Sequence, residues 1–288
     1  MAPEEHHDRH IINIMSSTPL YQKIPANVYY LLAFLPVATA SLAVYTIFTC
    51  ANLTFEANVL PKELRFPPIS LFGVRPGSPE QILYFWGFPA VAALFLVSTV
   101  PISSYLMANV EKDSEDGAWK ASWTSSVAFL GLAIHGMVPL HPDILEMIHG
   151  REQSGDGMAQ SAIHQLAAAM FFMLSMYHGF VVCNLLWSTE KLPTGWKNSG
   201  IVGKFSFVVK SLTLAMQLLP AMTGLLYHPA TLYILGIKGT LNESDQGGLA
   251  QWWTVGCLIF FYLTYSLDLV LIGSHLNSSV LVDIKKNN

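Results

Sequence analysis

Histidine side chains are the groups of this sequence best suited to chemistry, and two of them lie in one long apolar stretch. His164 and His178 are 14 positions apart. In a helix they would lie within about 40° of each other around the axis, but about 21 Å apart along it. A histidine inside a membrane is costly unless it faces other helices and has a partner there. We therefore predict both as catalytic residues; the alternative is that each only links helices through hydrogen bonds.

Three further histidines, His135, His141 and His149, precede this stretch. With His164 near the same end of its helix, they would form an acid–base or metal-binding pocket at the level of the lipid headgroups. Glu146 lies three positions before His149, a spacing that occurs in helical metal sites but is also common by chance. We predict the three histidines as substrate-binding residues and expect neither a metal nor a cofactor. The alternative is a solvated loop.

The composition indicates that these residues act in a membrane. Of the 288 residues, 52% are hydrophobic and 12% are charged, and the charged share is about half that of soluble domains. The mean hydropathy is +0.42. A net charge of −4 provides no basic surface for nucleic acid, which we exclude as a partner. The sequence has no Gly-x-Ser-x-Gly, Walker or His-Glu-x-x-His motif, so the enzyme classes that use them lack support.

Six stretches are long enough to cross a bilayer, which takes roughly 20 apolar residues in a helix. They cover residues 28–50, 82–107, 121–140, 163–187, 205–227 and 252–274. Within them only Lys210 and Asp268 carry a charge, each near a span end, where a long side chain can reach the interface. We predict an all-α, polytopic membrane protein, a bundle of six transmembrane helices over residues 28–274. Residues 1–27 and 275–288 would be polar segments outside the membrane.

Lysine and arginine are in excess in the short cytosolic loops of membrane proteins, and here they favour one orientation. With a cytosolic N-terminus, ten of the 15 basic residues face the cytosol and five face the lumen. This distribution predicts that both termini are cytosolic. The same orientation places the sequons at Asn52 and Asn242 in the first and last lumenal loops, so we predict both as glycosylation sites.

The chain ends with Lys285-Lys286-Asn287-Asn288, which puts two lysines at the fourth and third positions from the C-terminus. On a cytosolic tail this arrangement resembles the dilysine retrieval signal read by the COPI coat, which is an address and not an anchor. We predict Lys285 and Lys286 as that signal and the COPI coat as a partner. The alternative is two lysines that lie beside lipid headgroups.

Three separated regions resemble one superfamily of six-span membrane proteins. They hold Pro68-Ile69-Ser70, Gly73 and Pro79-Glu80; Ile163-His164 and His178; and Trp253-Thr254, Leu263-Thr264-Tyr265 and Asp268. These motifs are similar to those of the superfamily that includes the DRAM autophagy modulators, the FGF-receptor-activating or post-GPI-attachment factor two proteins, and the N-terminal region of the fungal Cwh cell-wall proteins. The pair of histidines in one span is similar to the post-GPI-attachment branch.

The first of these motifs adds a candidate substrate-binding residue, and the first and third motifs each lack an acidic residue of the family pattern. Ser70 is the hydroxyl at a motif position, and we predict it as substrate-binding; the alternative is a turn residue among prolines. Two acidic positions of the family pattern are occupied here by Leu71 and Trp252, which weakens an argument for catalysis by analogy.

The resemblance implies fatty-acid remodelling of GPI anchors in the endoplasmic reticulum or Golgi. The reaction would be reacylation of lyso-GPI, either by catalysis or by assistance to an acyltransferase, with membrane lipid and a GPI-anchored protein as partners. His164 and the lumenal histidines would then supply a general base and headgroup contacts. The alternative is a non-enzymatic, DRAM-like regulator or scaffold of autophagy and endolysosomal traffic in the lysosomal membrane, in which the histidines only pack helices.

Overall fold

The computed structural model describes residues 24–110, 115–149, 157–189, 192, 197 and 199–287, and most of these residues are helical. No strand occurs among these residues. The long helices are α3 (Ala26–Leu32), α4 (Phe34–Glu56), α5 (Pro79–Asn109), α6 (Glu115–Met137), α8 (Met158–Ser188), α9 (Ile201–Met222), α11 (Glu243–Leu263) and α12 (Tyr265–Asn287). The short ones are η2 (Ile69–Gly73), α7 (Asp143–Ile148), η4 (Leu225–Tyr227) and α10 (Pro229–Ile234).

Five helical segments of the described chain are long and apolar enough to cross a membrane. They are Ala26–Glu56, Pro79–Asn109, Met158–Ser188, Ile201–Leu218 and Glu243–Ser278. The first joins α3 to α4, and the last joins α11 to α12, each across a single residue. The chain is therefore an all-α, multi-pass membrane protein, as the composition predicts. The cytosolic N-terminal segment predicted for residues 1–27 lies, up to residue 23, outside the described residues.

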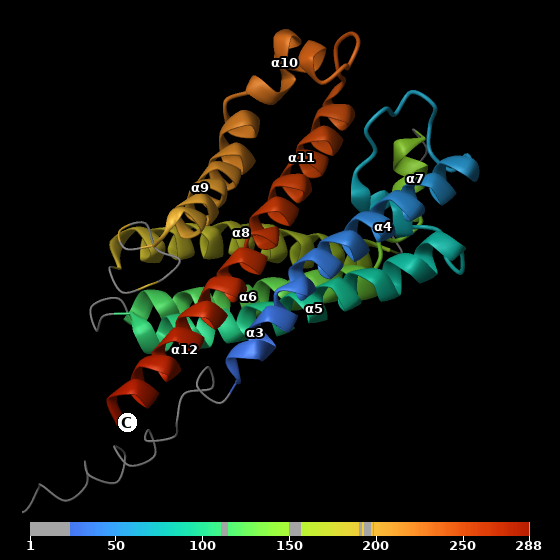
Figure 1. The fold of residues 1–288 in the computed structure, drawn as a ribbon. Helices are drawn as coiled ribbons and strands as arrows, with labels where there is room; N and C mark the ends of the chain where they lie inside the picture. Colours follow the sequence, from blue (N-terminus) through green and yellow to red (C-terminus); the bar gives the residue numbers. More distant parts are fainter. Residues whose placement is uncertain are drawn as a thin grey trace, which may run out of the picture.

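The third predicted span, residues 121–140, corresponds to α6, which is not among these five segments. Serine, threonine and glycine residues lower its hydropathy. They also let it lie close to its neighbours: a Cβ added at Gly131 would stand 2.9 Å from the Ala167 carbonyl oxygen on α8. α6 lies between α5 and α8 (Figure 1). Small residues are typical of helix contacts inside membranes, so the position of α6 supports the sixth span, which remains a prediction.

Two predicted span boundaries differ from the helix ends for local reasons. The fifth apolar stretch was predicted to run to residue 227, but α9 ends at Met222 and Gly224 adopts a positive φ of 68°. The last stretch was predicted to begin at residue 252, but α11 begins at Glu243, where Asn242 caps it by accepting a hydrogen bond from the Asp245 N–H. Polar residues of a helical first turn carry no hydropathy signal, which explains the second difference.

The helices pack as a bundle whose two ends differ. α5, α6 and α8 lie side by side, α4 packs on α5, and α11 packs on α9 more closely than on α4 (Figure 1). We call the end that carries η2, α7 and α10 the long-loop end, and the end where α5, α8 and α12 finish the short-loop end. The predicted orientation places the long-loop end in the lumen.

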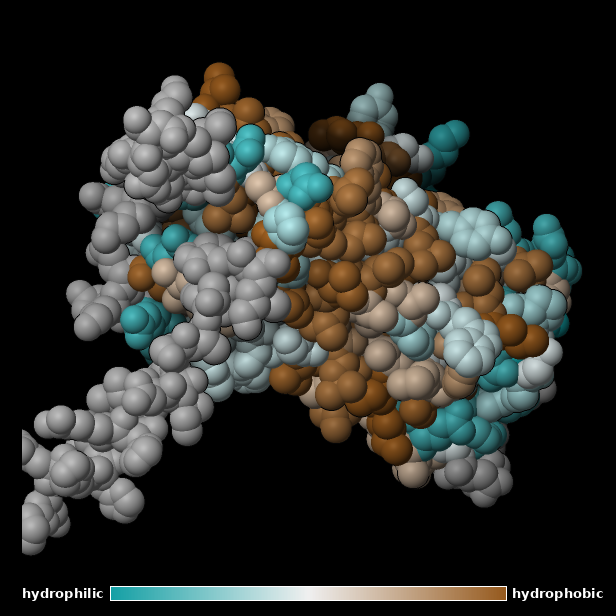
Figure 2. All heavy atoms as spheres, turned by 60° about the horizontal axis from the view of Figure 1, so that its bottom comes forward, coloured by the Kyte–Doolittle hydropathy of each residue, from teal (hydrophilic) through white to brown (hydrophobic). Residues whose placement is uncertain are grey.

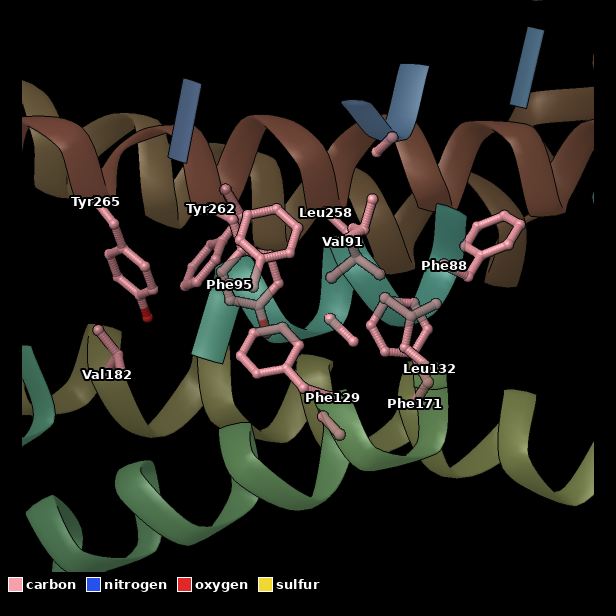
Figure 3. Packing of buried hydrophobic residues seen from close by; sticks show 14 of the residues in the cluster. Phe88, Val91, Phe95, Phe129, Leu132, Phe171, Val182, Leu258, Tyr262 and Tyr265 are labelled. Atoms are coloured by element: carbon pink, nitrogen blue, oxygen red, sulfur yellow. The ribbon is translucent and has the colours of Figure 1, made fainter. Parts of the chain in front are cut away.

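The surface and the interior of the bundle are both apolar, as lipid contact requires. Figure 2 shows a broad apolar surface across the middle of one face, with hydrophilic patches towards its edges. Large side chains such as Phe34, Leu166 and Phe180 are exposed. Inside, rings from three helices meet at the centre: Phe95 stacks on Phe129 with 5.5 Å between centroids and approaches Tyr262 at 4.8 Å (Figure 3).

Candidate functional site

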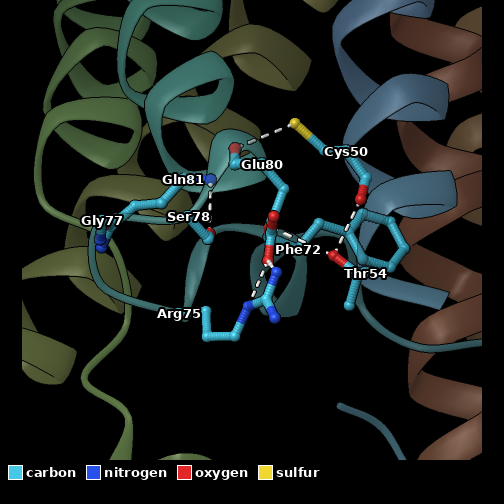
Figure 4. Close-up of polar contacts among 8 residues, drawn as sticks. All are labelled: Cys50, Thr54, Phe72, Arg75, Gly77, Ser78, Glu80 and Gln81. Carbon is cyan, nitrogen blue, oxygen red and sulfur yellow. Dashed lines mark hydrogen bonds and ion pairs between the residues drawn. The ribbon is translucent and has the colours of Figure 1, made fainter. Parts of the chain in front are cut away.

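The first long loop is fixed to the start of α5 by its own polar groups (Figure 4). Ser78 caps α5 by accepting a hydrogen bond from the Gln81 N–H at 3.2 Å. Arg75 donates to the carboxylate of Glu80 at 2.7 Å, and Glu80 is 1% exposed. The Cys50 thiol on α4 donates to the Glu80 carbonyl oxygen at 3.3 Å. The Pro-Glu motif thus anchors α5 against α4 and sets the rotation of α5 from its first turn.

Tyr84 follows one turn later and is held by close packing. A Cβ added at Gly73 of η2 would lie 2.7 Å from Cγ of the Tyr84 ring, so only glycine leaves room for this ring. Tyr84 is 1% exposed, and its hydroxyl lies 2.6 Å from Nε2 of His135 at the end of α6. The motif glycine therefore positions a tyrosine that contacts one of the predicted site histidines. Tyr84 was not predicted, although it begins the aromatic run that follows the motif.

His135 and His164 face each other, with 4.0 Å between ring centroids. Nδ1 of His164 lies 2.7 Å from the Val138 carbonyl oxygen. A carbonyl oxygen only accepts, so Nδ1 carries the proton and Nε2 of the neutral ring keeps a lone pair. The structure thus brings together two of the predicted histidines and fixes the tautomer of one.

Each of these two rings keeps one nitrogen without a hydrogen-bond partner among the described residues: Nδ1 of His135 and Nε2 of His164. Both side chains are buried. Oε2 of Glu80 and Oγ1 of Thr46 are also buried without a partner in this part of the chain. Buried polar atoms are nearly always paired in native proteins, so the two unpaired ring nitrogens of the adjacent histidines mark a place where a ligand can supply the partner.

An apolar cavity adjoins the histidine pair in the centre of the bundle. His135 is one of its few polar wall residues. The centre of a water molecule can occupy only about 50 Å³ of it, so the cavity is narrow. Its apolar wall includes Phe88, Val91, Leu132, Phe171, Leu258 and Ile259. A hydrocarbon chain fits these walls better than a polar headgroup does.

Chemically, the pair offers a neutral base beside a second imidazole, in a space from which water is largely excluded. The lone pair on Nε2 of His164 can accept a proton from a hydroxyl group. If Tyr84 donates to Nε2 of His135, Nδ1 of His135 carries a proton and can donate to an oxygen. No cluster of three or more metal-ligating side chains occurs within the described ranges.

His178 lies in a different environment near the short-loop end. Its Nδ1 donates to the Ala121 carbonyl oxygen at 2.8 Å, so its Nε2 accepts from the Tyr265 hydroxyl at 2.5 Å. The ring is 2% exposed and also stacks on Tyr262. Both nitrogens are occupied by protein groups. These contacts link α8 to α6 and α12 and match the packing alternative for His178.

Lys210 and Asp268 form a buried ion pair next to this histidine. Nζ of Lys210 lies 2.7 Å from the Asp268 carboxylate, and Ser206 donates to the same carboxylate at 2.8 Å. Lys210 is fully buried, so the expectation that its side chain reaches the interface was wrong. The pair was missed because hydropathy does not give the relative rotation of two helices. The i, i+4 spacing of Ser206 and Lys210 puts both on one helix face, and this was the sequence signal for a polar contact of the lysine inside the bundle.

The remaining predicted site residues lie apart from the histidine pair. His141 packs on Gly157 at the start of α8, seven residues and about 10 Å along the helix from His164. His149 is exposed, and its Nε2 lies 3.1 Å from the Val59 carbonyl oxygen. Ser70 is half-buried within η2, which matches the turn alternative. Within the described chain, no contact joins any of these three to His135 or His164.

The predicted modification and signal residues differ in their local structure. Asn52 lies within the last turns of α4 and not in a loop, and Thr54 of its sequon is 2% exposed. Asn242 is exposed at the start of α11. Lys285 and Lys286 lie in the last turn of α12. Of the two sequons, only that of Asn242 is exposed along its whole length, at the start of α11.

The two positions at which the chain departs from the family pattern have packing roles. Leu71 is buried in η2. Trp252 donates from Nε1 to the Pro67 carbonyl oxygen at 3.0 Å and packs on Phe72 with 5.8 Å between ring centroids. Apolar side chains thus hold the first loop against α11 where the family pattern has acidic groups.

No known family, curated protein or solved structure shows a significant match to this chain. The family resemblance therefore stands on the residues quoted above, and the case for function stands on the geometry of the histidine pair and its cavity.

Proposed function

We propose that this chain acts in fatty-acid remodelling of a membrane glycolipid of the secretory pathway, with the GPI anchor as the lipid that the motif resemblance favours. The observation that carries the proposal is Nε2 of His164, which has no hydrogen-bond partner among the described residues. Its ring lies beside that of His135, which lines a narrow apolar cavity. An acyl-transfer site needs a base near a hydroxyl and an apolar space for the chain that is transferred.

The residues of the pair have distinct roles in this reaction. Nε2 of His164 takes the proton of a lipid hydroxyl, and the hydroxyl oxygen forms an ester bond to the carbonyl carbon of an acyl ester or thioester. The bond from that carbon to the leaving oxygen or sulfur breaks, and the leaving group takes the proton. His135, held by Tyr84, donates from Nδ1 to the carbonyl oxygen while negative charge develops on it.

The competing function is a non-enzymatic membrane regulator or scaffold in the endolysosomal system. It is favoured by His178, whose two nitrogens are both used to hold helices together. On this reading His164 would be a packing residue as well. The two functions predict different results when Nε2 of His164 is removed and its contact with Val138 is kept: a catalytic role predicts loss of activity, and a packing role does not.

The test is complementation of cells that lose GPI-anchored proteins from their surface because they lack the post-GPI-attachment factor. We expect the wild-type chain to restore the surface proteins. In His164→Asn, the amide N–H can replace Nδ1 as donor to Val138, but no atom replaces Nε2. Loss of a general base costs about 100-fold or more in rate, so this variant should fail to restore them at a normal protein level.

The matched control is His178→Asn, which keeps a donor for Ala121 and loses the contact with Tyr265. It should restore surface proteins in proportion to the amount of protein present. A well-expressed wild-type chain that restores nothing would overturn the GPI proposal. Full restoration by His164→Asn would instead mean that the chain assists an acyltransferase and that His164 only packs helices.

We also propose that the chain resides in the endoplasmic reticulum and Golgi through recognition of Lys285 and Lys286 by the COPI coat. The support is their position relative to the C-terminus. Changing both to serine should move a tagged chain onward to later compartments, as seen by microscopy against Golgi and lysosomal markers. The tag belongs at the N-terminus, because a C-terminal tag would displace the signal. If the tagged chain keeps its distribution, Lys285 and Lys286 are not a retrieval signal.

A further inference from the structure

A groove runs between α4 and α11 on the outer surface of the bundle. Its walls come from Val37, Ala40, Val44 and Phe48 on one helix and from Gly256 and Phe260 on the other. Nothing lies within 4 Å of a Cβ added at Gly256, so this glycine leaves open space in the groove. The groove lies in segments apolar enough to cross a membrane, and lipid is the medium that covers such a surface.

The groove and the internal cavity lie on either side of the same side chains. Three side chains, Ile47, Val255 and Ile259, line both spaces. They form a thin wall between the lipid-facing surface and the interior where His135 lies. All three are aliphatic, so a chain that passes between them loses no hydrogen bond.

The first long loop explains why α11 leaves this opening. Asp245 of α11 accepts hydrogen bonds from the backbone N–H groups of Arg65 at 2.7 Å and Phe66 at 2.9 Å. Gly248 passes directly beneath the Phe66 carbonyl oxygen, where a Cβ would lie 1.6 Å away. Near the long-loop end α11 is thus held by the loop as well as by helix packing, and it packs less closely on α4 than on α9.

We propose that the gap between α4 and α11 is a lateral entrance through which a single lipid acyl chain passes from the bilayer into the internal cavity. Phe48 and Trp252, with 5.7 Å between ring centroids, close the groove towards the long-loop end. The chain enters below them and lies among the apolar walls, with its carbonyl end towards His135. This inference rests on the proposed function for what happens to that carbonyl, but the entrance itself does not depend on it.

A second, smaller hollow reaches the cavity from the other side of α11 through Phe172 and Gln251. It contains the polar side chains of Gln217 and Thr254. The α4–α11 groove has Ser41 as its main polar group and is the better surface for a hydrocarbon chain.

The entrance is tested by filling it. The purified full-length chain is placed in phosphatidylcholine vesicles that contain a fraction of phosphatidylcholine with a diazirine in one acyl chain, and is irradiated. Gly256→Leu places a side chain in the groove, where its Cβ has nothing within 4 Å. Gly247→Leu is the matched control, because Gly247 lies in the same helix and also has nothing within 4 Å of an added Cβ, but does not line the groove.

We expect the wild-type chain and Gly247→Leu to be labelled at Phe171 and Leu132, which line the cavity. In Gly256→Leu this inner labelling should fall several-fold, while labelling at the exposed Phe180 is unchanged. The proposed entrance is wrong if only outer residues of the wild-type chain are labelled. It is also wrong if the inner residues of Gly256→Leu are labelled as strongly as those of the wild-type chain. If the inner residues are labelled normally but His164→Asn still supports remodelling, the proposed role of His164 is wrong and the entrance still stands.

Discussion

The bundle contains two buried histidine clusters, and they differ in whether their polar atoms have partners. Around His178, both ring nitrogens, the ammonium of Lys210 and the carboxylate of Asp268 are paired with protein groups. Around His164, two imidazoles each keep one nitrogen without a partner among the described residues. A buried unpaired group costs about 1–3 kcal/mol, so the second cluster lowers stability where the first does not.

Their positions explain the difference. The paired cluster joins α6, α8, α9 and α12 near the short-loop end, and the nitrogens of its histidine and the charges of its ion pair all have protein partners. The unpaired cluster lies beside the cavity, where a bound lipid can supply what the protein does not. In a bilayer the helices cannot turn these atoms towards water, so unpaired groups next to a cavity are a stronger sign of function than histidine as such.

The largest expected effect is in the paired cluster. Asp268→Leu leaves the Lys210 ammonium buried without its counter-ion, and breaking such a pair costs about 3–5 kcal/mol of unfolding free energy. We expect a large loss of folded protein, measured by denaturant titration in detergent micelles.

The control is the double variant Lys210→Met with Asp268→Leu. Replacing both members of a buried ion pair by apolar side chains is often neutral, so the double variant should be more stable than the single one. Equal destabilisation of the two would show that packing, and not the unpaired charge, sets the cost.

The second expected effect compares the histidines directly. His178→Leu leaves the Tyr265 hydroxyl buried with no acceptor on that side, which should lower the unfolding free energy by about 1–3 kcal/mol. Adding Tyr265→Phe should recover part of this loss, because it removes the orphaned hydroxyl. No recovery in the double variant would mean that the hydroxyl finds another partner.

The third effect concerns the glycine that positions the unpaired cluster. Gly73→Ala places a Cβ 2.7 Å from Cγ of the buried Tyr84 ring, and overpacking of this kind costs about 1–3 kcal/mol. Since Tyr84 carries the contact with His135, GPI-anchored protein restoration should fall as well. Gly200→Ala, with nothing near its added Cβ, is the control and should leave both unchanged.

The sequence predicts the fold well because apolar length is a property of each segment alone. It places Asn242 and the acidic first turn of α11 less well, because a cap and the charges at a helix start are signals that hydropathy ignores. The meeting of His135 and His164 follows from their placement at the same end of neighbouring helices. That part of the site is a consequence of topology.

The rest of the site depends on helix rotation, which the sequence does not give. The pairing of Lys210 with Asp268 and the separation of His141 from His164 both depend on which faces of the helices meet. Tyr84 depends on close packing against Gly73. The free nitrogen of His164 depends on the position of one carbonyl oxygen, that of Val138. Such details follow from packing in three dimensions and have no counterpart in spacing along the chain.

The smallest expected change in unfolding free energy, that of His164→Leu, is the most informative about the contrast between the two histidine clusters. His164→Leu removes one hydrogen bond, to Val138, but it also removes a buried nitrogen that has no partner. The two contributions have opposite signs and are each about 1 kcal/mol, so the unfolding free energy should change by less than about 1 kcal/mol. Measured beside His178→Leu in the same titration, a loss at His164 as large as that at His178 would mean that Nε2 has a partner in the membrane. In that case the contrast between the two clusters would disappear, and with it the reason to assign chemistry to one and packing to the other.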